Sequence, residues 1–337
     1  MQASIVAGFL LILLAALMNG AYAIPMRFMV RWRWENVWLI WTILSLWIFP
    51  VAMAWLSVPH PLAAYAGTSW SALLRMGSMG LLWGTGVLLL GMSFPLVGVA
   101  VGAAVGLGCA AAMGTMLPML YGGAAGVSRA TGEMIFAGVV IVLLGVGVCG
   151  LAGRMRERSQ EAAIEATGQS IRGFVYASVG GALTAGLNLA LAMGGSISVA
   201  VERQHPVSMG AGIAVWVPVL LAGGIPGVLY TLALLRRNHA ATFFLTWGTF
   251  IYWPLIALMG VLWLGSIVVY GNGVLRSGPL GLIIGWPVFM SGAVIASAMW
   301  GSLFGEWKNS GVRARVTMVA GVCFLTIAIT ILGKAGR

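Results

Sequence analysis

Ten apolar runs of roughly 20 residues follow one another along the chain, and this feature restricts the fold more than any other. Their approximate bounds are 3–24, 36–57, 73–93, 96–121, 133–152, 172–194, 208–235, 247–270, 279–304 and 316–334. Lipid offers the backbone no hydrogen bonds, so each run must form a helix or join a closed barrel. Because the runs are continuously apolar and do not alternate, they predict an all-α integral membrane protein with ten transmembrane helices.

Charged residues make up only 7% of the 337 residues, whereas a soluble domain carries about 25%. In a soluble protein the net charge of +11 would suggest nucleic-acid binding. Here the basic residues lie between the apolar runs, so the expected partner is the lipid bilayer and not nucleic acid. The sequence holds no nucleophile–base pair, phosphate-binding loop or metal-ligand cluster, so it predicts neither an enzyme nor a cofactor nor a metal.

The basic residues also predict the orientation in the membrane. Twelve Lys and Arg residues fall in the connections after the first, third, fifth, seventh and ninth runs, and six fall in the other connections and the tails. The positive-inside rule places the twelve in the cytoplasm. In a bacterial inner membrane, both termini would then lie on the non-cytoplasmic side. The first run has no basic residue before it, so we expect a retained helix and not a cleaved signal peptide.

The chain repeats itself, and the matching segments keep the same order in both halves. The matches are 16–20 (ALMNG) with 182–186 (ALTAG) at a spacing of 166, 79–91 (MGLLWGTGVLLLG) with 259–271 (MGVLWLGSIVVYG) at 180, Gly98 and Gly102 with Gly281 and Gly285 at 183, and 137–154 with 320–337 at 183. The repeat divides the chain into a first half (1–153), a polar cytoplasmic linker (154–171) and a second half (172–337), with five helices in each half.

An odd number of helices in each half determines how the halves are related. The second copy must enter the membrane upside down relative to the first, which predicts two inverted five-helix repeats. Inverted repeats are typical of secondary transporters, in which the substrate site lies near mid-membrane where the halves meet. We therefore interpret the chain as a carrier.

Four segments resemble a known transporter family: NGAYAIPMRFMVRWRWENVW (19–38), GLLWGTG (80–86), LLGVGVCGLAGRMRER (143–158) and FGEWKNSG (304–311). The family is the L-rhamnose–proton symporters of the drug/metabolite transporter superfamily, and the resemblance runs in order through nearly the whole chain. It implies ten helices, the inverted repeat and uptake of a sugar driven by protons, with alternating access. The alternatives are a metabolite or amino-acid exporter of the same superfamily and an uncoupled sugar facilitator.

Two segments depart from what the resemblance implies. After WGTG it implies Asn and Tyr, whereas residues 87–90 of the chain are VLLL. In the eighth run it implies Gln and aromatic residues, whereas residues 266–269 are SIVV and only Tyr270 matches an aromatic position. We therefore expect a less polar substrate cavity.

A sugar is bound by hydrogen bonds to amide and hydroxyl groups and by aromatic faces against its C–H surfaces. Asn19 and Tyr22 lie about one turn apart in the first run, and Thr184 and Asn188 do so in the sixth. The other candidate substrate-binding residues are the repeated Trp83 and Trp263, together with Trp216, Ser266, Tyr270 and Trp286. The alternative for these residues is hydrogen bonding and packing between helices.

Residues near the ends of the runs suggest other roles. A proton relay usually needs a titratable group within the membrane, and no such group lies at the centre of a run. Glu133 opens the fifth run and Glu306 closes the ninth, so these are the candidates for proton coupling, with a capping or interfacial charge as the alternative. The tryptophans near the second run are typical of an aromatic belt at the membrane surface: Trp32, Trp34, Trp38 and Trp41.

The orientation can be checked with reporters fused after Arg337. We expect an alkaline phosphatase fusion to be active and a green fluorescent protein fusion to be dark, because the carboxyl terminus is predicted outside the cytoplasm. The reverse pair of signals would show that the twelve basic residues face outward.

Overall fold

The computed structural model describes residues 2–122, 127–160, 171–204, 210–278 and 280–336, and these residues form helices and turns without a strand. Within these ranges ten helical segments are long and apolar enough to cross a membrane, which confirms the predicted number. The elements are α1 (Gln2–Ala21), η1 (Ile24–Phe28), α2 (Trp34–Thr42), η2 (Ile43–Ile48), α3 (Phe49–Ser57), α4 (Pro61–Ala66), α5 (Trp70–Val97), α6 (Val99–Gly122), α7 (Arg129–Gln160), α8 (Ile171–Thr184), α9 (Gly186–Met193), α10 (Gly195–Gln204), α11 (Gly210–Arg237), η3 (Ala240–Leu245), α12 (Tyr252–Arg276), α13 (Gly281–Leu303) and α14 (Val312–Ala335).

Three spans are not uniform α-helices, and the first of them, from Ile5 to Phe28, ends in the 3-10 helix η1. The second span runs from Trp34 to Ser57 and contains a π-helical turn, η2, between α2 and α3. The sixth span runs from Ile171 to Met193 and is interrupted at Ala185, between α8 and α9. No proline marks this interruption. Irregular turns of this kind are frequent at functional sites, where they redirect side chains.

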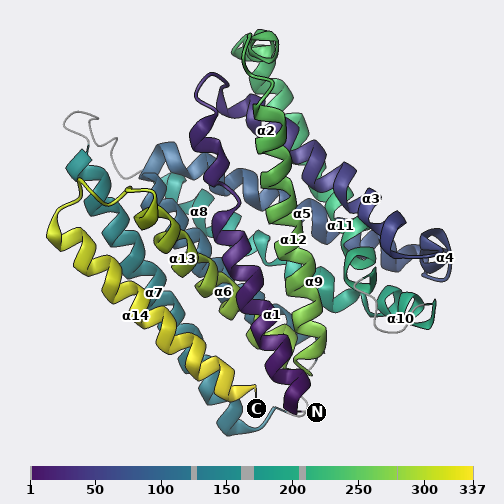
Figure 1. Ribbon diagram of the computed structural model, residues 1–337. Helices are drawn as coiled ribbons and strands as arrows, with labels where there is room; N and C mark the ends of the chain where they lie inside the picture. The colour runs from purple at the N-terminus through teal and green to yellow at the C-terminus, as the bar shows by residue number, and fades with distance from the viewer. Residues whose placement is uncertain (1, 123–126, 161–170, 205–209, 279, 337) are drawn as a thin grey trace.

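The two chain ends lie together at one edge of the bundle, the lower edge in Figure 1. This agrees with an even number of crossings. We call this side the terminal face. The opposite side, where α1, α5, α7, α11 and α13 end, is called the basic face because the connections after these helices carry the twelve basic residues. Residues 154–160 continue α7, whereas 161–170 of the expected linker lie outside the described residues.

The main contacts between helices occur in pairs. When both helices of such a contact are replaced by the helices five spans away in the chain, the result is again an observed contact. Helix α1 packs against α12 and α13, and α8, which opens the sixth span, packs against α5 and α6. Helix α7 packs along α14, the last span, at one edge of the bundle (Figure 1). Helix α11 packs against α2, η2 and α3 of the second span.

Small residues allow the closest helix contacts. The Cβ that a substitution would add at Gly80 or Gly84 of α5 would collide with the backbone of α11, at Val219 and Gly223 respectively. Gly91 is also in α5, but a Cβ added there would meet nothing within 4 Å. Close approach through glycine is a common way for membrane helices to pack, because lipid gives apolar side chains no reason to associate.

This difference predicts the effect of two matched substitutions. Gly84→Ala forces α5 away from α11 and should destabilise the protein by about 1–3 kcal/mol, the usual range for overpacking. Gly91→Ala should not lower stability, because alanine favours the helix and its Cβ meets no neighbour. Thermal unfolding in detergent, followed by size-exclusion chromatography, measures both, and equal melting temperatures would contradict the packing of α5 on α11.

Candidate functional site

Two cavities lie side by side at the basic face. The axial cavity, with a volume of about 450 Å³, lies between α1, α6, α7 and α13, and the connection from α13 to α14 forms part of its rim. The aromatic cavity, about 580 Å³, lies between the ends of α1, α5 and α11 and the beginnings of α2 and α6. Tyr22 and Val99 line both cavities and therefore separate them.

The axial cavity reaches the middle of the bundle. Asn19, Leu107 and Met290, which belong to the middle third of their spans, line it. Its walls are mostly small residues of α6, α7 and α13, such as alanine and glycine, so the space results from short side chains. A solute entering from the basic face would therefore arrive at mid-membrane beside the Asn19 amide.

Asn19 is joined to the eighth span at this depth. Its Nδ2 donates to Ser266 Oγ at 3.1 Å, and Ser266 Oγ donates to the carbonyl oxygen of Trp263 at 2.6 Å. Ser266 is fully buried, whereas Asn19 is partly exposed to the axial cavity. The structure thus places Asn19 and Tyr22 at the axial cavity, with Ser266 behind Asn19.

A row of aromatic rings leads from Tyr22 into the centre. The ring centroids of Tyr22 and Trp41 are 5.9 Å apart, those of Trp41 and Trp263 are 5.4 Å apart, and those of Trp263 and Trp83 are 5.5 Å apart. The repeated tryptophans, Trp83 and Trp263, therefore pack against each other. Both are buried and neither lines the axial or the aromatic cavity, so neither ring is accessible to a solute from these cavities in this conformation.

The expected aromatic belt is wrong for two of its four tryptophans. Trp32 and Trp41 are buried, at 6% and 4% exposure, because Trp32, in the turn before α2, packs against Phe244 and Tyr252, and Trp41 packs against Trp263 of α12. Trp41 belongs to the aromatic row, and Trp32 packs edge-on against Tyr252 with ring centroids 5.5 Å apart. Trp34 and Trp38 are stacked on each other and line the aromatic cavity.

A second group of predicted residues meets near the terminal face. The Asn188 cluster consists of fully or almost fully buried side chains that belong to α9, α11, α12 and α13: Asn188, Trp216, Tyr270, Trp286 and Phe289. Tyr270 lies between Trp286 and Phe289, with ring centroids 5.6 and 4.8 Å away. Neither basic-face cavity reaches this cluster.

The Asn188 amide is fully engaged within the cluster. Its Nδ2 donates to the carbonyl oxygens of Gly114 at 2.8 Å and Leu282 at 2.9 Å, and its Oδ1 accepts from the Tyr270 hydroxyl at 2.6 Å. Trp286 Nε1 donates to the carbonyl oxygen of Ala110 at 3.0 Å. In this conformation Asn188 therefore cross-links helices and has no amide proton left for a substrate. Thr184 lies apart from it and donates to Gly181 of its own helix.

The two glutamates proposed for proton coupling lie in different surroundings. Glu306 lines the axial cavity, and its carboxylate oxygens lie 3.2 Å from Arg27 Nη1 and 2.9 Å from Arg156 Nη1. Glu133 pairs with Arg129 at 2.9 Å, one turn earlier in α7, and 67% of its side chain is exposed. Glu133 does not line either cavity, so the structure brings only Glu306 to the candidate site.

Sequence reasoning missed Arg156 and Glu157, which it placed on a solvated linker. Both are half-buried residues of α7 that line the axial cavity. Glu157 Oε1 also accepts a hydrogen bond from the backbone N–H of Ala100 at 3.1 Å, at the beginning of α6. Helical spacing could have indicated their position. Gly150 and Gly153 precede Arg156 and Glu157 at intervals of three or four residues, so all four lie on one face of α7, and all four line the same cavity.

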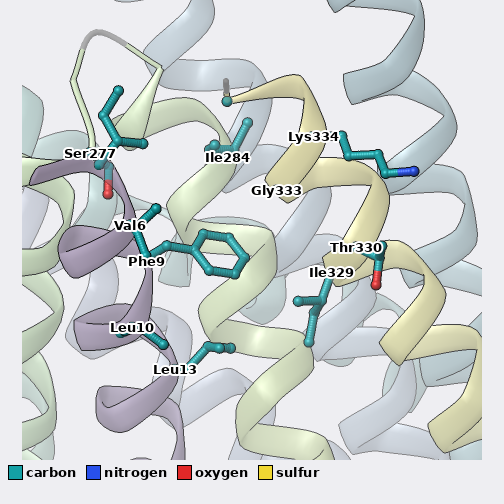
Figure 2. A pocket seen from close by; sticks show the side chains of 12 residues that line it. Val6, Phe9, Leu10, Leu13, Ser277, Ile284, Ile329, Thr330, Gly333 and Lys334 are labelled. Carbon is teal, nitrogen blue, oxygen red and sulfur yellow. The ribbon is translucent and has the colours of Figure 1, made fainter. Parts of the chain in front are cut away.

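A third cavity lies at the terminal face between α1, α13 and α14 and has a volume of about 400 Å³. Figure 2 shows Phe9 reaching from α1 into this groove, with Ile329 of α14 and Ile284 of α13 on the opposite walls. Lys334 lies at its rim. None of the predicted substrate-binding residues lines it.

The comparisons with known proteins agree with one another. The protein-family model described as L-rhamnose-proton symport protein (RhaT) matches residues 1–336. Proteins named L-rhamnose-proton symporter from Escherichia coli (strain SMS-3-5 / SECEC) and Shigella boydii serotype 18 (strain CDC 3083-94 / BS512) are each 26% identical over 340 residues, which covers 99% of this chain and 98% of theirs. These names describe transporters and not enzymes, as the sequence predicts. The match extends through all ten spans and includes the residues that line the axial and aromatic cavities. The chain therefore belongs to the L-rhamnose-proton symport protein family.

Proposed function

We propose that the chain is a secondary active transporter that carries a rhamnose-like sugar together with protons across the inner membrane by alternating access. The observation that carries this proposal is the one-sided axial cavity. It opens at the basic face and reaches Asn19 at mid-membrane, whereas the Asn188 cluster fills the corresponding depth toward the terminal face. With the basic face in the cytoplasm, this is an inward-open conformation.

The two halves act as inverted repeats in this proposal. Three observations support the relation: the helix contacts recur five spans later, the number of spans in each half is odd, and the matched tryptophans Trp83 and Trp263 touch each other. In such a pair of repeats the halves can exchange conformations, which closes one cavity and opens its counterpart on the other face.

The cavity linings favour a sugar with an apolar edge. Asn19 and Tyr22 offer an amide and a phenol, while most other lining groups are Ala, Gly, Val and Leu. The apolar residues Val87, Leu88 and Leu90, which replace polar residues that the resemblance implied, line the aromatic cavity. A 6-deoxy sugar such as rhamnose carries a methyl group that can lie against such a surface, while its hydroxyls bond to the amide and phenol.

Glu306 is the residue that we assign to proton coupling. Its carboxylate connects Arg27, just after α1, to Arg156 in α7, and all three side chains lie at the mouth of the axial cavity or beside it. Protonation would remove the negative charge between the two arginines, so the rim would lose both ion pairs. Proton binding would thereby change the relative free energy of the open and closed rim, as coupling requires.

Substitution at Asn19 tests substrate binding. Asn19→Ala should raise the KM for sugar uptake about two- to twelvefold, the value expected for one lost hydrogen bond of about 0.5–1.5 kcal/mol. Ser266→Ala removes the partner of Asn19 but leaves the amide at the cavity, so it serves as the control. It should lower the melting temperature with a smaller change in KM. If both variants lowered the melting temperature equally and left KM unchanged, Asn19 would only link α1 to α12 and would not bind the substrate.

Substitution at Glu306 tests coupling and function together. Adding L-rhamnose to lightly buffered cells that express the wild type or Glu133→Gln should raise the external pH as protons enter with the sugar. Glu306→Gln should abolish the rise and concentrative uptake, while exchange of labelled for unlabelled sugar continues. Uptake without a pH rise in the wild type would indicate a facilitator. No uptake of any sugar in a panel, with efflux of other metabolites, would indicate an exporter.

A further inference from the structure

We propose that Asn188, Tyr270 and Trp286 form the gate that closes the transport pathway toward the terminal face, and that the Tyr270 hydroxyl is its latch. This inference rests on the proposed alternating access. It assigns to these residues a closing role in the present conformation and substrate contact only when the gate opens.

The hydrogen bonds of the cluster join the helices that must separate for the pathway to open. Asn188 in α9 binds the Gly114 carbonyl in α6, the Leu282 carbonyl in α13 and the Tyr270 hydroxyl in α12. Trp286 adds a second bond from α13 to α6, at the Ala110 carbonyl. The bonds to Gly114 and Ala110 cross from the second half of the chain to the first, so the cluster holds the two halves together on this side.

The sequence repeat shows what lies at the equivalent positions on the open side. At the repeat spacings of 166, 180 and 183, Asn188 corresponds to Tyr22, Tyr270 to Leu90, and Trp286 to Ala103. All three counterparts line the cavities of the basic face. The same three positions are thus uncovered in one half and buried together in the other, as expected for a gate that is open on one face and closed on the other.

The groove at the terminal face lies where the repeat places the counterpart of the axial cavity. Val146, Gly150 and Gly153 line the axial cavity, and their counterparts Ile329, Gly333 and Gly336 line the groove of Figure 2. The groove is narrowed by Phe9, whose ring lies 3.1 Å from the position that a Cβ on Gly333 would take. Ile284 in the groove wall is two residues before Trp286, so the gate lies directly behind this wall.

The chemistry of the cluster allows it to open. Its closure depends on single hydrogen bonds, and the Trp216 indole N–H, which lies against Gly271 beside Tyr270, is buried without a partner in the described structure. An unpaired buried donor opposes closure, whereas the bonds of Asn188 favour it. A sugar hydroxyl can replace the Tyr270 hydroxyl as the donor to Asn188 Oδ1, so substrate arriving from the terminal face would compete with the latch.

Removal of the latch should expose the buried wall of the groove in front of the gate. The reporter is Ile284→Cys in a chain whose native cysteines, Cys109, Cys149 and Cys323, are replaced by alanine; Ile284 is 3% exposed in the closed state. Tyr270→Phe keeps the ring and deletes one hydrogen bond, so it should raise the labelling rate by an impermeant maleimide from the terminal face about two- to tenfold. Whole cells and inside-out vesicles identify the labelled face.

Tyr65→Phe is the matched control. It also deletes a phenolic hydroxyl that donates one hydrogen bond, but this hydroxyl belongs to α4 outside the cluster, and its acceptor is the backbone carbonyl of Ala214 at 2.9 Å. It should leave labelling unchanged. Trp286→Phe removes the hydrogen bond to Ala110 and should raise labelling as Tyr270→Phe does. It replaces Tyr270→Phe as the test variant if Tyr270→Phe does not fold. Equal labelling in all three variants and the parent would overturn the gate. Labelling needs no sugar, so this result is distinguishable from a failure of the wild type to transport sugar.

Discussion

The bilayer core offers polar groups no water, and this constraint governs how the buried polar side chains of the candidate site are arranged. Asn188 meets it with two backbone carbonyls and a phenol, Trp286 with a carbonyl of a neighbouring helix, and Ser266 with a carbonyl of its own helix. Asn19 and Tyr22 instead face the axial cavity, and in the proposed transporter they lie on the path of the substrate.

The candidate residues fall into three levels along the membrane normal. Asn19 and Tyr22 face the open cavity, Ser266, Trp263 and Trp83 lie at the centre, and the Asn188 cluster lies toward the terminal face. At the mouth of the axial cavity, Glu306 carries one negative charge between Arg27 and Arg156, and Glu157 adds a second carboxylate to the lining. In the proposed function, an uncharged sugar passes this charged mouth to reach mid-membrane, and a change in protonation acts at the rim.

The sequence predicts the number and order of the spans and the residue types of the candidate site. It does so because a span in lipid must be apolar over about 20 residues, and a polar group within it needs a hydrogen-bond partner. The sequence does not predict the grouping of these residues. In a membrane helix both the lipid-facing and the buried faces are apolar, so periodicity gives little indication of which face turns inward. The sequence therefore places Trp41 at the membrane surface although it is buried, and it does not indicate that the candidates Asn19 and Asn188 lie at different levels. Arg156 was missed because charge suggested solvent, whereas α7 extends past the apolar run and turns it onto the rim.

The contact between Trp83 and Trp263 has a consequence for the kinetics of the cycle. Two residues that are related by a twofold rotation can touch only if both lie close to the rotation axis. In the proposed repeat, the Trp83–Trp263 pair therefore lies across the pseudo-twofold axis. Surroundings on that axis are alike in the inward- and outward-facing forms. A smaller ring at either position would thus perturb both forms alike and alter the barrier between them, changing turnover without biasing the direction in which the carrier rests.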